Sequence, residues 1–223
     1  LYQAKQKIVR ANIGKLFKSD YKVALADIKG SDRGADFPVP GWYARPNQFF
    51  YNAFGNSYDV RQMDWLFLHE ATPGHHFHAG AREKSNRCGF ISDGPPVFYE
   101  GWAAYVETLG KDLGLYQTPG QELGGIEWNI IRSARVVLDV GINYYGWSDK
   151  KALAYWRQHV IGQDDKAMRE ITRMRNWPAQ VITYKYGADV FERMKQHYLE
   201  VNGESADVRK YYDIVMSHGL MPL

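Results

Sequence analysis

The stretch LFLHEATPGHHFH, residues 66–78, is the part of the sequence on which the predicted fold and site both depend. It places four histidines and one glutamate within ten positions, although the whole chain has seven histidines. His69 and Glu70 come first, and a Pro-Gly pair separates them from the other three histidines. Imidazoles gathered around a carboxylate in this way indicate a metal site.

The first two residues match half of the H-E-x-x-H metallopeptidase motif. In that motif two histidines one helical turn apart bind zinc, and the intervening glutamate is the general base for the metal-bound water. Here the fourth position after His69 is Pro73, and the next histidines are His75 and His76. On an unbroken helix, side chains six apart diverge and side chains seven apart lie roughly 10 Å apart, so neither histidine could share an ion with His69.

Pro73 and Gly74 predict that the helix bulges or breaks at this point. Proline removes a backbone donor and disfavours helical geometry at Thr72, and glycine accepts backbone angles that other residues do not. A two-residue bulge would bring His75 to the place of the missing i+4 histidine, so His75 ranks above His76 as the second ligand. Alternatively, these are polar residues at a helix break whose imidazoles cap backbone groups.

The segment VFYEGWAAYVE, residues 97–107, predicts a second helix that could supply the third ligand. Glu100 and Glu107 are seven residues apart and share one side of an otherwise apolar helix. Because an unpaired carboxylate is costly to bury, metal coordination would satisfy it. We expect Glu100 to be the ligand, and Glu107 to hold the far nitrogen of a ligating histidine or to be an alternative ligand. Both acids could instead pair with Arg or Lys at a helix surface.

The composition is that of a globular protein with a substantial core. The 223 residues are 45% hydrophobic, and the net charge is +3 with both signs mixed along the chain, so no basic patch indicates nucleic acid as a partner. No run approaches the ~20 apolar residues of a membrane span. The single cysteine, Cys88, excludes an internal disulfide and a cysteine-rich metal site. Because the chain has no signal peptide and does not begin with Met, we expect a fragment or a processed product.

Most of the chain is predicted to be helical. An amphipathic helix over residues 1–18 is followed by an irregular loop over 27–47 and an aromatic strand over 48–54. The edge of that strand could pair with an extended peptide at the lip of a cleft, or the strand could simply cover the core. A Gly- and Pro-rich loop is expected over 85–96. Further helices are predicted over residues 59–72, 97–107, 123–145, 150–160, 164–175, 177–201 and 205–218.

Two of these helices carry further candidate residues. Arg132, Arg135 and Asp139 share one face of the helix over 123–145, beside an apolar stripe of Ile131, Val137, Leu138 and Ile142. An arginine there could bind a substrate carboxylate, or the charges could orient the metal site, or they could form an internal salt bridge. Tyr184 and Tyr186 could donate to a developing oxyanion, although tyrosines on helices usually serve packing.

Read together, the motifs HEATPGHH, EGWAAYVE, RVVLDVGINYYGWS, PAQVITYKYG and MSHGLMPL resemble, in this order, the bacterial family known as domain of unknown function family 885. The resemblance covers about residues 40–223. It implies a mainly α, zincin-like metallopeptidase, similar to angiotensin-converting enzyme and the Taq-type carboxypeptidases, with a short strand or small sheet lining a deep cleft. Because family members are about twice as long, residues 1–223 would be one domain, the C-terminal catalytic half. The N-terminal half would be missing, and the location would be the bacterial periplasm or cell envelope.

Carried over residue by residue, the resemblance makes His69, His75 and Glu100 the ligands of one zinc ion and Glu70 the general base. It also makes Tyr184 and Arg135 candidates for contacts with the substrate or the transition state, with His76, Glu107 and Asp139 as supporting residues or alternative ligands. Two positions depart from the family pattern. Asn143 stands where a histidine is usual, and Pro-Ala-Gln-Val replaces Pro-Gly-Gln-Ala at residues 178–181.

The predicted function is therefore zinc-dependent hydrolysis of peptides, or of another small substrate, by a water that Glu70 activates. Two alternatives from other classes stay open. The chain could be a non-catalytic module that binds peptides and retains a metal site, or a metal-dependent hydrolase of a non-peptide amide or ester.

Overall fold

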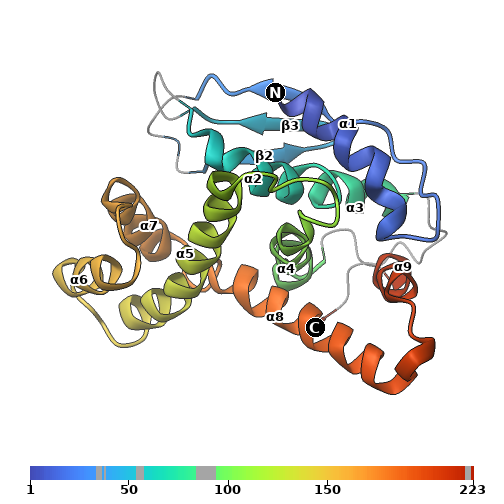
Figure 1. Ribbon diagram of the computed structural model, residues 1–223. Helices are drawn as coiled ribbons and strands as arrows, with labels where there is room; N and C mark the ends of the chain where they lie inside the picture. The colour runs from blue at the N-terminus through green and yellow to red at the C-terminus, as the bar shows by residue number, and fades with distance from the viewer. Residues whose placement is uncertain (34–36, 38, 54–57, 84–93, 219–221) are drawn as a thin grey trace.

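The computed structural model in Figure 1 describes residues 1–33, 37, 39–53, 58–83, 94–218 and 222–223. Over these residues the protein is mainly helical with one small sheet, as the sequence predicts. Cys88 and most of the loop predicted over 85–96 lie outside the described residues. No helix within them is both long and apolar enough to cross a membrane.

The elements follow one another in a short α–β segment and then a long helical one. In order they are α1 (Tyr2–Asn12), η1 (Ile13–Lys15), β1 (Asp27–Gly30), β2 (Gly41–Ala44), β3 (Gln48–Tyr51), η2 (Val60–Gln62), α2 (Met63–Glu70), α3 (His75–Glu83), α4 (Pro96–Val106), η3 (Glu107–Leu109), α5 (Pro119–Asn143), α6 (Asp149–His159), α7 (Asp164–Asn176), α8 (Ile182–Asn202), η4 (Gly203–Ser205) and α9 (Val208–His218).

The three strands form a sheet in the order β1-β3-β2, with β1 parallel and β2 antiparallel to β3. The strand predicted over 48–54 is present as β3, but the loop predicted over 27–47 contains both other strands. Because these are four residues long and flanked by Gly and Pro, they lack the periodic pattern that predicts a strand. β3 is paired on both sides, so its edge cannot receive a peptide. That part of the prediction was wrong, and the edge strands of this sheet are β1 and β2.

The register leaves one edge of β2 unpaired with the sheet. The Asn52 N–H donates to the Pro40 carbonyl at 2.8 Å, and Tyr43 lies opposite Phe49. Because bonded and non-bonded pairs alternate in an antiparallel ladder, the backbone groups of Gly41 and Tyr43 point away from β3.

Below the sheet in Figure 1, α4 lies against α8, and α5 contacts α6, α7 and α8. The contact between α4 and α8 is made possible by two glycines. A Cβ atom placed on Gly101 would lie 2.5 Å from the Cα of Gly187, so the two backbones touch there. This close approach brings Glu100, which precedes Gly101, to the first turn of α8.

Two of the helix predictions need correction. In α5, which is capped by Thr118, Ile131, Leu138 and Ile142 are buried as predicted, but Val137 is 41% exposed. Val137 belongs to a row of exposed aliphatic residues, with Leu123, Ile126 and Ile130, on the outer face of the helix. The last long helix begins at Ile182 and not at residue 177, because Ala179 has a φ of 66°, outside helical geometry.

Candidate metal centre

The helix that carries His69 ends at Glu70, and α3 begins at His75. The Thr72-Pro73 peptide bond between them is cis, so the chain makes a complete break where the sequence predicted a bulge or a break. A Cβ atom on Gly74 would lie 1.8 Å from the carbonyl oxygen of His69, which leaves room only for glycine. The indole N–H of Trp102, on α4, donates to the Pro73 carbonyl at 2.9 Å and ties the break to the next helix.

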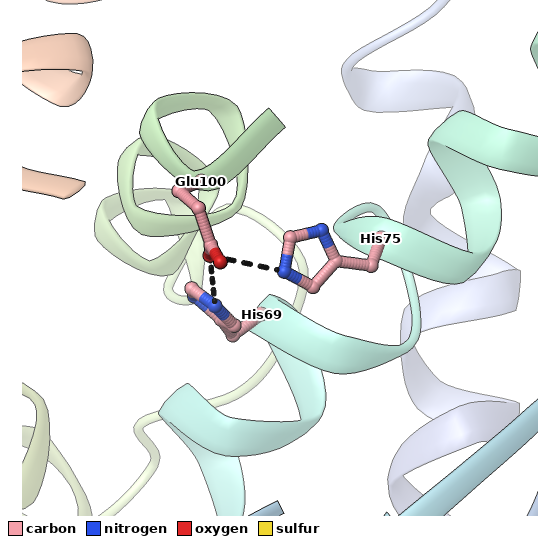
Figure 2. A group of neighbouring side chains, drawn as sticks. All are labelled: His69, His75 and Glu100. Atoms are coloured by element: carbon pink, nitrogen blue, oxygen red, sulfur yellow. Dashed lines mark ion pairs between the residues drawn. The ribbon is translucent and has the colours of Figure 1, made fainter. Parts of the chain in front are cut away.

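The break aims two imidazoles at one carboxylate, as Figure 2 shows. The Nε2 atoms of His69 and His75 lie 3.4 and 3.3 Å from Oε2 of Glu100, and the three ligand atoms lie within 4.8 Å of one another. Ligands held tetrahedrally at the usual zinc distances of about 2.0–2.1 Å are themselves roughly 3.3 Å apart. The buried Oε2 of Glu100 has no hydrogen-bond partner among the described residues. The three side chains could therefore hold a metal ion.

The other ring nitrogen of His69 is held from behind. Its Nδ1 lies 2.7 Å from Oε1 of Glu107, and Arg132 pairs with the second oxygen of Glu107. All three side chains are buried. A carboxylate in this position fixes the orientation and tautomer of a ligating imidazole and leaves the opposite nitrogen free for a metal.

The site shifts the pKa of its own groups in the metal-free protein. Burial alone would lower the pKa of His69, but the neighbouring carboxylates of Glu100 and Glu107 outweigh burial and raise it to about 9. Burial raises the pKa of Glu100, but its ion pairs with His69 and His75 outweigh this and hold the pKa well below the usual range. His69 thus carries a proton that a bound metal would displace.

Glu70 faces the same pocket from the end of α2. It is 6% exposed and lines a cavity of about 680 Å³ together with the three candidate ligands. Burial raises its pKa, while His69 and His75 act in the opposite direction, and the backbone N–H of Tyr43 on β2 donates to it. Glu70 is outside the ligand group and beside it, where a proton acceptor would be needed.

Tyr184 closes the pocket on the side of α8. Its hydroxyl donates to Oε1 of Glu100 at 3.1 Å and accepts from Gln180 at 2.9 Å and from Arg173 at 3.1 Å. Its ring stacks on His69 with the centroids 5.8 Å apart. Burial raises the pKa of Tyr184, and Glu100 adds to this, so the hydroxyl keeps its proton and stays a donor. Tyr186 is half exposed and does not line the pocket.

Three of the predicted site residues lie away from the three candidate ligands. His76 is buried beside Tyr43, outside the ligand group, and burial lowers its pKa to about 4. Asp139 accepts from the Ala179 N–H at 3.0 Å and thus fixes the turn before α8. Arg135 is 1% exposed, pairs with Glu170 and does not line the pocket, so its position offers no contact with a substrate.

A guanidinium that reaches the pocket beside Tyr184 is that of Arg173, on α7. No local pattern in the sequence distinguishes it, since it lies in a short, highly charged helix where arginines are usually solvated. Asn143 donates to Asp139 at 3.2 Å and to the Met174 carbonyl at 3.0 Å. It therefore joins α5 to α7 and does not line the pocket.

The comparisons with known proteins agree with the resemblance. The family model described as bacterial protein of unknown function (DUF885) matches residues 2–223. The chain belongs to this family. Among curated proteins, none matches the chain.

Solved structures with the same fold include two candidate lipoproteins. One, from Colwellia psychrerythraea, has a TM-score of 0.90 and 23% identity over 99% of this chain, and the match covers 40% of that chain. Another, of unknown function and from Shewanella oneidensis, has a TM-score of 0.74 and 21% identity over 99% of this chain, covering 44% of that chain. This DUF885 chain thus spans less than half the length of the two proteins, and at this identity they show its fold alone.

Proposed function

We propose that this protein is a zinc-dependent peptide hydrolase. The observation that carries the proposal is the convergence of His69, His75 and Glu100 in one pocket, with Glu70 beside them. Two imidazoles and one carboxylate at this spacing suit zinc and leave a fourth position open. A zinc ion bound there would polarise the scissile carbonyl and lower the pKa of a water molecule.

The residues of the chain would divide the remaining work. Glu70, whose burial raises its pKa toward the working range of a general base, would accept the proton of the water and pass it to the leaving amine. Tyr184 keeps its proton and would turn the O–H that it gives to Glu100 in the metal-free protein toward the oxygen on which charge develops. Gln180 and Arg173 hold the Tyr184 hydroxyl in place. Glu107, backed by Arg132, would keep His69 oriented throughout.

The outer edge of β2 favours a peptide over other amides or esters. The outward backbone groups of Gly41 and Tyr43 border the pocket, and the Tyr43 N–H donates to Glu70, which leaves the other outward groups for a substrate. An extended peptide could add to this edge as a further strand, which would lay its backbone across the candidate metal centre. Substrates without a peptide backbone could not use this edge.

A location in the cell envelope is part of the proposal. The two solved structures with this fold are described as candidate lipoproteins, which is consistent with that location. Because the chain spans less than half of each, the remainder of a longer protein would complete the cleft.

Replacing Glu70 by Gln tests the proposal. The variant should bind zinc as the wild type does but lose about a thousand-fold or more in kcat, because the general base is gone. Zinc content and hydrolysis of a panel of peptides, small amides and esters would be measured side by side. Glu200→Gln, at an exposed position of α8, is the matched control and should keep full activity.

Unchanged activity in the Glu70→Gln variant would rule out Glu70 as the base. If the zinc-loaded wild type binds peptides but cleaves none of the panel, the protein is a binding module. Cleavage of small esters or amides without cleavage of peptides would instead identify a non-peptide hydrolase.

A further inference from the structure

Arg173 is a charged group that lines the pocket and forms no direct ion pair with an acidic side chain of the described residues, although Glu170 and Glu100 lie near enough to raise its pKa. The buried arginines of α5 each have a carboxylate, since Arg132 pairs with Glu107 and Arg135 pairs with Glu170. Arg173 is half-buried, and no acidic group of the described residues forms an ion pair with it. Glu170, one turn earlier on α7, is taken by Arg135.

The contacts that Arg173 does make are with neutral groups, and they hold only one of its nitrogens. Its Nη2 donates to Oε1 of Gln180 at 2.8 Å and to the Tyr184 hydroxyl at 3.1 Å. The Nε and Nη1 groups have no acceptor among the described residues. Neither group is among the buried atoms without a partner, so both can meet a ligand that enters the pocket, while Nη2 holds the guanidinium in position.

The chemistry of the missing partner follows from the shape of the guanidinium. Its planar fork of N–H donors matches the two oxygens of a carboxylate, and such bidentate pairs are among the strongest hydrogen bonds in proteins. Arg45, which is exposed after β2, also lines the pocket, and Arg82 on α3 lines it too but already interacts with another group. The acids in the lining are Glu100, which belongs to the candidate metal centre, and Glu70, which lies beside it. The remainder of the lining therefore favours an anionic group.

The distance from Arg173 to the metal centre sets where on a substrate that carboxylate lies. Two consecutive contacts of 3.1 Å, through the Tyr184 hydroxyl, join Arg173 to Oε1 of Glu100, a candidate ligand. The two groups are thus no more than about 6 Å apart, and one extended residue spans about 3.3–3.6 Å. This reach suits a carboxylate carried by the residue immediately after the scissile bond.

We infer that Arg173 binds the free C-terminal carboxylate of the substrate, so that the protein removes single residues from the C-terminal end of peptides. The inference rests on the proposed function and names its substrate class. A carboxylate from an Asp or Glu side chain has the same chemistry, and the experiment has to separate the two sources.

The test compares three probes on the zinc-loaded protein. They are a blocked dipeptide with a free C-terminal acid, its C-terminal amide, and an amide of the same length whose last residue is Asp. For each, kcat/KM is measured for the wild type, for Arg173→Gln and for the control Arg175→Gln, an exposed arginine on the same helix that pairs with Asp149. Binding of the acid and the amide to the Glu70→Gln variant, with and without Arg173→Gln, is measured by calorimetry.

The wild type should prefer the acid over both amides by about a hundred-fold. Arg173→Gln should abolish this preference, because cleavage of the acid slows far more than cleavage of the amides, which lose only the support that Arg173 gives to the Tyr184 hydroxyl. Arg175→Gln should change nothing. An equal loss for acid and amide in Arg173→Gln would show that Arg173 acts on the developing oxyanion and would overturn the inference. So would equal cleavage of acid and amide by the wild type, or an Arg173-dependent preference for the Asp amide.

The calorimetric measurements distinguish a failure of the proposed function from a failure of the assignment of Arg173. If no peptide is cleaved but the acid binds more tightly than the amide, and only when Arg173 is present, the proposed function fails while the assignment of Arg173 holds. If binding ignores both the carboxylate and Arg173, the assignment of Arg173 fails whatever the activity.

Discussion

The two nitrogens of His69 face surroundings of opposite kinds. On the Nδ1 side, Glu107 and Arg132 form a buried ion pair. On the Nε2 side, Glu100 presents a buried oxygen without a hydrogen bond among the described residues, and His75 points at that same oxygen. On the first side both carboxylate oxygens of Glu107 are paired, whereas on the second side Oε2 of Glu100 is left to be satisfied by something that binds. The second side is therefore the functional one.

The change with the largest expected effect removes the carboxylate of Glu100. Glu100→Ala should weaken zinc binding by roughly a thousand-fold or more, because one of three protein ligands is lost. Zinc affinity would be measured by competition with a chelator, and circular dichroism would show that the fold persists. Glu122→Ala, a surface change on α5, is the control. Zinc bound to Glu100→Ala as tightly as to the wild type would exclude Glu100 as a ligand.

A change at Glu107, on the Nδ1 side of His69, should also lower the zinc affinity, but by less. Glu107→Gln keeps the shape of the side chain but removes the charge that orients His69, so zinc affinity should fall by about 10–100-fold. The same competition assay applies. If Glu107→Gln matched Glu100→Ala in its loss, the two sides would not differ as described.

The pH dependence of zinc binding tests the effect of the two carboxylates on His69. Glu100 on one side and Glu107 on the other together raise the pKa of His69 to about 9. Below that pH the metal has to displace a proton, so the affinity should rise roughly tenfold per pH unit as the proton becomes easier to remove. Titrations between pH 7 and 8 should still show this rise. An affinity that levels off above pH 7 would mean that His69 titrates like an ordinary histidine.

The smallest effect is expected at Ala179, which lies on neither side of His69. Ala179 has a φ of 66°, in the left-handed region that favours glycine, and it begins the turn that leads to Gln180 and Tyr184. Ala179→Gly should raise the free energy of unfolding by about 1 kcal/mol or less, because the relief of strain is partly offset by the entropy of glycine in the unfolded chain. Chemical denaturation measures this, and zinc affinity should not change. A loss of stability would show that Ala179 is not strained.

The sequence predicted what depends on local backbone chemistry. The Pro-Gly pair at residues 73–74 predicted an interruption, which the structure confirms. The spacing of Glu100 and Glu107 predicted that both acids face one side, and both contact His69, although α4 ends at Val106 and Glu107 begins η3. The helix predicted over residues 150–160 is present as α6, which begins at Asp149 after the Ser148 side chain accepts from the Lys151 N–H.

What the sequence could not predict depends on partners distant in the chain. The face shared by Arg132 and Arg135 is visible in the spacing, but the acids that meet them come from η3 and α7. Nothing local distinguishes Arg173 from other arginines, because its role follows from how α7 and α8 meet at the pocket. The strands β1 and β2 are stabilised by pairing with β3, which a four-residue window does not reveal.

The most direct test of the central claim is anomalous scattering at the zinc edge from crystals grown with zinc, together with elemental analysis of the same protein. One zinc ion per chain should lie about 2.0–2.1 Å from Nε2 of His69 and of His75 and within bonding distance of the Glu100 carboxylate. A chain that binds no zinc, or an anomalous peak away from these three side chains, would contradict the account.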